Sequence, residues 1–148
     1  MAKKYVLDAK LRAANTLVGL LTRLGLGPGI YHILTTTGRK SGQARQTPVI
    51  VMSKGGERWI VSPYGARPWV KNVRAGGEVG IRRGFRKESI ALEEVDARTA
   101  APILKEYIQN VPITRPYFDV QADSPDEAFV IEAPRHPVFR VVSSTGSA

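Results

Sequence analysis

Residues 35–45 have the side chains and the glycines that an anion-binding loop needs. The segment reads Thr-Thr-Thr-Gly-Arg-Lys-Ser-Gly-Gln-Ala-Arg and contains no acidic residue. Apolar runs at 30–34 and 48–52 predict that it connects two strands of a hairpin. Its glycines allow backbone N–H groups to approach a ligand closely, and its cations and hydroxyls suit a phosphate. We therefore interpret it as an anion-binding loop; the alternative is a solvated basic turn.

The segment matches neither of the common nucleotide-binding motifs. The Gly-x-x-x-x-Gly-Lys-Ser/Thr pattern of the P-loop is absent, and no helical pattern follows Gly42. Residues 25–29, Gly-Leu-Gly-Pro-Gly, follow a helical pattern and contain a proline. We interpret them as a helix stop and a turn rather than a dinucleotide-binding fingerprint.

The composition predicts one strongly basic domain. The chain has 148 residues, with 22 Lys and Arg against 13 Asp and Glu, and a formal net charge of +9. Such an excess indicates an anionic partner, which could be nucleic acid, acidic lipid or a highly anionic small ligand. No helix-turn-helix, zinc-finger or RNP pattern is present. We therefore expect no nucleic-acid partner.

Other kinds of chemistry are not expected from this composition. The chain has no cysteine, so disulfide and thiol chemistry are excluded, and its two histidines show no metal-ligand spacing. No secretory signal and no apolar run of bilayer-spanning length are visible. We expect a cytoplasmic protein without a metal site.

Residues 3–24 have the periodicity of an amphipathic basic helix. Leucines and other apolar residues recur at helical spacing, while lysines and arginines form the polar side. The helix could pack on the core as a lid, or it could rest on the anionic inner face of a membrane as a peripheral contact. Both interpretations stay open.

The rest of the chain predicts a small antiparallel barrel. We divide the sequence into the N-terminal helix at 1–28, one domain at 29–142 and a frayed tail at 143–148. Strands are expected at 30–36, 46–52, 58–61, 78–82, 88–95, 129–132 and 138–142, helices at 68–75 and 98–111, and a loop at 112–126. Hairpin-linked short strands with flanking helices predict an α+β fold. The second strand is apolar on both sides, which favours a homodimer that covers one of them.

Two motifs together resemble a known family. They are Thr36-Thr37-Gly38-Arg39-Lys40-Ser41-Gly42 followed by Thr47-Pro48, and Ser62-Pro63-Tyr64-Gly65 followed by Trp69-x-x-Asn72. They resemble the deazaflavin-dependent nitroreductase and quinone reductase family of actinobacteria, which are split β-barrel oxidoreductases that use coenzyme F-420. The resemblance covers about 29–142.

The resemblance implies a role for each part of the two motifs. The basic loop would hold the anionic phospholactyl and polyglutamate tail of the cofactor, through Arg39, Lys40, Ser41, Gly42 and Arg45. The deazaflavin ring would lie against Thr47, Pro48 and Val49, with Trp69 and Asn72 on the helix beside it. Flavin mononucleotide (FMN) is less favoured because it would need fewer cations.

The implied reaction is hydride transfer from the reduced deazaflavin to a small, apolar, electron-poor acceptor such as a quinone, an enone or a nitro compound. Negative charge then develops on an acceptor oxygen, and a hydrogen-bond donor there lowers the barrier. The candidate donors are Ser62, Tyr64 and Tyr117, whereas Tyr107 and His136 are expected to be structural. The alternative is a non-enzymatic split-barrel protein that binds lipid, fatty acid or flavin.

Overall fold

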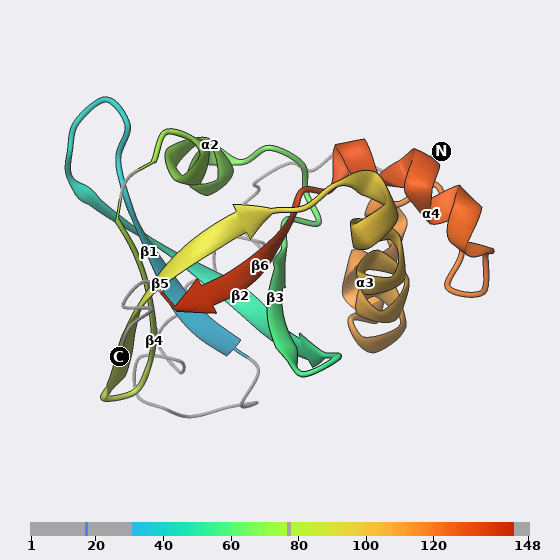
Figure 1. Ribbon diagram of the computed structural model, residues 1–148, viewed down its shortest axis with the longest axis horizontal. Coiled ribbons are helices and arrows are strands. Elements are labelled where there is room, and N and C mark those ends of the chain that lie inside the picture. Colours follow the sequence, from blue (N-terminus) through green and yellow to red (C-terminus); the bar gives the residue numbers. More distant parts are fainter. Residues whose placement is uncertain (1–16, 18–30, 77, 144–148) are drawn as a thin grey trace.

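The described part of the protein is a closed six-stranded barrel with helices on one side and across one end (Figure 1). The computed structural model describes residue 17 and residues 31–76 and 78–143, so the predicted helix at 3–24, residue 17 excepted, and most of the tail lie outside the described residues. The strands are β1 Tyr31–Thr37, β2 Ala44–Lys54, β3 Glu57–Val61, β4 Val79–Arg83, β5 Arg86–Glu94 and β6 Val138–Ser143. The helices are α2 Pro68–Arg74, α3 Ala97–Asn110 and α4 Asp126–Glu132, with short 3-10 turns η1 Pro112–Tyr117 and η2 Ala133–Arg135. The predicted α+β antiparallel barrel is confirmed.

The strands close the barrel in the order β1-β2-β3-β6-β5-β4, and every pair is antiparallel. Hairpins join β1 to β2, β2 to β3 and β4 to β5. The last strand, β6, lies between β3 and β5. The β2–β3 ladder covers only Val51–Lys54, so Pro48 pairs with Ile33 of β1 alone. This local edge suits a proline, because proline donates no ladder hydrogen bond.

Two apolar cores lie on the two faces of the sheet. The barrel interior contains Leu34, Val51, Ile60 and Phe139 and is closed at one end by Trp69 and Val70 of α2. The outer core contains Met52, Trp59, Leu104 and Phe129 and is covered by α3 and α4. Because successive strand residues face opposite sides, neighbouring Val51 and Met52 enter different cores.

The outer core covers the apolar side of β2 from which a homodimer was predicted. The side of β2 away from the barrel interior is covered within the chain, because Met52 and Ile50 pack in the core beneath α3. The apolar character of β2 therefore needs no second subunit.

One predicted strand is wrong. Residues 129–132 belong to helix α4, with Phe129 fully buried against α3. A short apolar run has no clear period, and the better signal was Pro125 followed by Asp126 and Glu127, which are typical of a helix N-terminus. The predicted loop at 112–126 also contains the turn η1.

Candidate active site

A cleft of about 420 Å³ opens between the β1–β2 turn, the start of β2 and helix α2. The turn and the start of β2 are contiguous in sequence, and the more distant α2 meets them because it packs across the end of the barrel. The lining residues are Gly38, Arg39, Lys40, Ser41, Arg45, Gln46, Thr47, Pro68, Trp69 and Asn72. None of these lining residues is acidic.

The turn of the hairpin is a compact loop of residues 38–43. The strands extend to Thr37 and resume at Ala44, so the turn is shorter than the segment identified from the sequence. Gly38 N–H donates to the Gln43 carbonyl over 2.7 Å, and Gly42 N–H donates to the Gly38 carbonyl over 2.8 Å. A Cβ atom at Gly38 would lie 2.7 Å from the Ser41 hydroxyl oxygen and 3.2 Å from the Gln43 carbonyl oxygen. A side chain at that position would displace the Ser41 hydroxyl and crowd the Gln43 carbonyl, so glycine suits this tight turn best.

Asn72 ties the turn to helix α2 through one buried amide group. Its Oδ1 accepts from the backbone N–H of Arg39 over 3.2 Å and from Nη1 of the same residue over 3.0 Å. Its Nδ2 donates to the hydroxyl of buried Thr36 over 3.2 Å. Asn72 is only 3% exposed, so the amide contacts are shielded from water and hold Arg39 in one place.

The Trp69-x-x-Asn72 motif has a structural explanation. Residues three apart lie on the same side of a helix. Trp69 is buried in the barrel core, where its ring lies 5.5 Å from the ring of Phe139. The tryptophan fixes the position of α2, and the asparagine one turn later then meets the β1–β2 turn.

The chemistry of this cleft suits a large anionic ligand. Arg39, Lys40 and Arg45 are exposed at its rim, and the hydroxyl-bearing Ser41 is exposed beside them. The indole of Trp69 provides an aromatic surface at the bottom. The observed donors therefore fit an anionic cofactor with a flat ring system.

Seven of the ten predicted cofactor-binding residues line the cleft: Arg39, Lys40, Ser41, Arg45, Thr47, Trp69 and Asn72. The other three, Gly42, Pro48 and Val49, do not. Gly42 has a φ of 71° and shapes the turn, whereas Pro48 is half-buried and Val49 is buried in the barrel core. Sequence reasoning missed Gln46 and Pro68; Pro68, at the first turn of the predicted helix beside Trp69, could have been found.

The three predicted hydrogen-bond donors lie outside the residues that line this cleft. The rings of Tyr64 and Tyr117 meet edge to face, with their centroids 4.8 Å apart. Both are half-buried. Ser62 is buried, and its hydroxyl donates to the Gly65 carbonyl within the same loop. Tyr107 is buried in the outer core as expected, and burial raises its pKa, with smaller contributions from Tyr64 and Tyr31.

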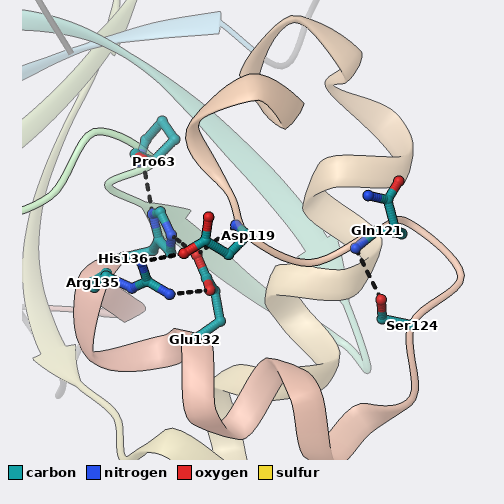
Figure 2. Close-up of polar contacts among 7 residues, drawn as sticks. All are labelled: Pro63, Asp119, Gln121, Ser124, Glu132, Arg135 and His136. Carbon is teal, nitrogen blue, oxygen red and sulfur yellow. Dashed lines mark hydrogen bonds and ion pairs between the residues drawn. The ribbon is translucent and has the colours of Figure 1, made fainter. Parts of the chain in front are cut away.

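A buried polar network holds the loop that carries Tyr64 (Figure 2). Nδ1 of His136 lies 2.8 Å from the Pro63 carbonyl oxygen, and Nε2 lies 2.7 Å from Oε2 of Glu132. Glu132 also accepts from Arg135 over 2.7 Å and from the Asp119 backbone N–H over 3.2 Å. The Phe118 ring stacks on the imidazole at 3.7 Å. Gln121 and Ser124, also drawn there, close the loop before α4.

The network requires two protons in the Glu132–His136 pair. The Pro63 carbonyl can only accept, so Nδ1 carries a proton. A hydrogen bond between Nε2 and Oε2 needs a second proton, on the ring or on the carboxyl group. Burial lowers the pKa of His136, while the contacts with Glu132 and Pro63 oppose that shift. The two-proton pair has no net charge, which suits side chains that are 3% and 2% exposed.

The fold defines a split-barrel protein, and the chemistry of the cleft suits an anionic ligand. Three solved structures share the fold. The F420-H2 dependent reductase FDR-A is 22% identical over 76% of this chain and 93% of that one, with a TM-score of 0.52. A domain-swapped dimer is 23% identical over 78% of this chain and 82% of that one (TM-score 0.54), and a candidate pyridoxamine 5'-phosphate oxidase from Listeria innocua is 13% identical over 78% and 84% of the two chains (TM-score 0.53). A comparison with curated proteins found no significant match.

The chain belongs to the F420H(2)-dependent quinone reductase family, which matches residues 8–131. It is a deazaflavin-dependent oxidoreductase, and coenzyme F-420 is its cofactor. The family resemblance, the enzyme class and the cofactor predicted from the two motifs are confirmed. Among the described residues, no helix is long and apolar enough to cross a bilayer.

Replacing Asn72 by Ala should free the β1–β2 turn. Both Arg39 contacts to Oδ1 would be lost, at about 1 kcal/mol for each hydrogen bond. Hydrogen exchange at the Arg39 amide should therefore become at least about fivefold faster. Lys71→Ala, an exposed change on the same helix, should leave that amide unaffected. Equal exchange in the wild type and Asn72→Ala would contradict the proposed tie.

Replacing Glu132 by Ala should lower the free energy of unfolding by about 3–5 kcal/mol, because it leaves the buried ring of His136 without its partner. Urea unfolding measures the change. Glu127→Ala provides a matched control on the same helix, since Glu127 is 72% exposed and pairs with Arg98. That control should change stability by less than about 1 kcal/mol. Similar losses in the two variants would show that the network contributes little.

Proposed function

We propose that the cleft between the β1–β2 turn and α2 holds the anionic tail of reduced coenzyme F-420 and that the enzyme reduces a quinone. The observation that carries this proposal is the rim of Arg39, Lys40 and Arg45 around a cleft without acidic lining residues. The quinone acceptor comes from the description of the family.

The cations should act together on the tail. An exposed ion pair contributes only about 0.2–1 kcal/mol, so tight binding needs several of them and weakens as salt screens the attraction. Arg39 is already positioned by Asn72, which reduces the entropy lost on binding. Lys40 and Arg45 add charge at the same rim.

The remaining roles follow the same geometry. A bound reduced deazaflavin supplies a hydride to an electron-poor acceptor. Thr47 and Trp69 line the cleft and would contact the ring, and Pro48 and Val49 continue the same stretch of β2. Of the three predicted donors, Tyr64 and Tyr117 suit the oxygen of the acceptor better than Ser62, whose hydroxyl is buried and bonded to Gly65.

Removing the rim charges should weaken cofactor binding without changing the fold. We expect Lys40→Ala and Arg45→Ala each to reduce coenzyme F-420 affinity by about fivefold, the upper value for one exposed ion pair, with a larger loss in the double variant. Fluorescence titration measures affinity. In steady-state assays with a water-soluble quinone, KM for the cofactor should rise while kcat changes little, because the tail is remote from the reacting ring.

Arg98→Ala is the control for the rim variants, because it removes the same charge from an exposed position on α3. It should leave affinity unchanged. Equal affinity of the wild type and the double variant for coenzyme F-420 would show that the rim cations do not bind the cofactor. Tighter binding of FMN than of coenzyme F-420 would also contradict the proposed role of the rim.

We also infer that the enzyme is a homodimer. The inference is supported by one structural neighbour described as a domain-swapped dimer. The apolar face of β2 gives no such support, because it is covered within the chain. Sedimentation velocity at micromolar concentration should show a species of twice the chain mass. A monomer at every concentration would contradict the inference.

A further inference from the structure

The turn between β4 and β5 presents a fully exposed aromatic residue among cations. Phe85 is 101% exposed, the highest exposure of any large apolar side chain in the described residues. Arg83 pairs with Arg86 across the turn, so Gly84 and Phe85 form a two-residue connection. Gly84 has a φ of 59°, as the first central residue of a type II′ turn requires. The turn type therefore places Phe85 at the tip of a regular hairpin.

Positive charge surrounds this phenyl ring. Residues 82–87 read Arg-Arg-Gly-Phe-Arg-Lys. Arg82 donates to the Gly84 carbonyl over 2.8 Å, and Arg83 donates to the Tyr31 carbonyl over 3.0 Å. These carbonyl partners orient the guanidinium groups and leave their charge in place. We call residues 82–87 the basic tip.

The nearest acid on the same strand is already neutralised. Both oxygens of Glu88 accept from Arg58, over 2.9 and 2.6 Å, and this pair lowers the pKa of Glu88. A cavity of about 760 Å³ adjoins the tip, lined by His32, Arg58, Ile81, Arg83, Phe85, Arg86, Lys87 and Glu88. The tip therefore combines an exposed ring, clustered cations and a hollow large enough for a polar headgroup.

The basic tip lies at the opposite end of the barrel from the cofactor cleft. Along β1, Ile33 pairs with Arg82 on one side, while Thr36 pairs with Val79 near the β1–β2 turn. The β1–β2 turn and the β4–β5 turn accordingly extend from opposite ends of the sheet in Figure 1. A highly anionic cofactor tail and an anionic surface could therefore be bound at once without repelling each other at close range.

We propose that the basic tip docks on an anionic lipid bilayer, with Phe85 in the interface and the four cations against the headgroups. Aromatic rings favour the membrane interface, and juxtamembrane cations are attracted by anionic lipid. Single-stranded nucleic acid would instead need several aromatic rings on which successive bases stack, and the tip has one. The inference rests on the proposed function, because a lipid-soluble quinone is the acceptor that makes docking useful.

Sedimentation with vesicles tests the docking directly. The full-length protein is mixed, without cofactor or quinone, with vesicles of phosphatidylcholine alone or with phosphatidylglycerol added. Binding should need the anionic lipid and fall with salt. Arg86→Ala combined with Lys87→Ala should weaken partitioning about 30-fold, which is about 2 kcal/mol for two cations. Phe85→Ser should weaken it about tenfold. Two controls, Ile131→Ser at another exposed apolar position and Arg98→Ala at an exposed cation, should leave it unchanged.

A depth measurement gives a second readout. Tryptophan fluorescence of Phe85→Trp should be quenched by brominated lipids, and that of Ile131→Trp should not.

The two hairpin variants are Phe85→Ser and the double variant Arg86→Ala with Lys87→Ala. Both should reduce a water-soluble quinone at the wild-type rate but a vesicle-embedded long-chain quinone more slowly. Vesicle binding that is unchanged in both hairpin variants would overturn the proposal. Hairpin-dependent binding of single-stranded DNA without vesicle binding would overturn it in favour of nucleic acid.

These outcomes separate the two proposals. Loss of docking with intact reduction of the water-soluble quinone would remove the membrane surface and leave the proposed function standing. Docking that persists in a protein unable to reduce any quinone would remove the proposed function and leave the membrane surface standing.

Discussion

The burial of Trp69 at the end of the barrel is the contact on which the arrangement of the site depends. The indole packs against Phe139 inside the barrel and so fixes both the position and the rotation of α2. Asn72 follows on the same side of the helix and reaches the β1–β2 turn, where it orients Arg39. A short helix of seven residues would have little stability alone. Tertiary packing therefore sets the position of Arg39, a cation that the sequence predicts to bind the cofactor.

The sequence predicted those parts of the fold whose signals are local. The short connection expected between the strands at 46–52 and 58–61 is a turn in which Gly55 and Gly56 have positive φ values, and the helix expected at 98–111 is α3. The strand predicted at Phe129 was wrong because four residues cannot distinguish a period of 2 from one of 3.6. In the structure Glu132 is the last residue of α4, and His136 follows four residues later and pairs with it. The misassigned strand therefore also concealed the buried pair.

The candidate site could be predicted more fully than the buried polar network around His136. The cations of the turn and the Trp69-x-x-Asn72 spacing are visible in the linear chain, and seven of the residues named from them meet in one cleft. The contacts of Ser62 were not predictable, because its hydroxyl is bonded to a carbonyl three residues away in an irregular loop. The contact between His136 and Pro63 spans 73 positions in sequence. Such a pairing follows from the closed topology and has no signal of its own.

The position of β6 in the barrel has a consequence for how the chain folds during synthesis. This strand is the last element of the described residues and fills the gap between β3 and β5, which are translated before it. Until residue 143 leaves the ribosome, both neighbours present unpaired edges that can recruit strands from other nascent chains. The barrel therefore forms after translation of its final strand, and its long-range pairings make closure slow compared with a helical protein of the same size.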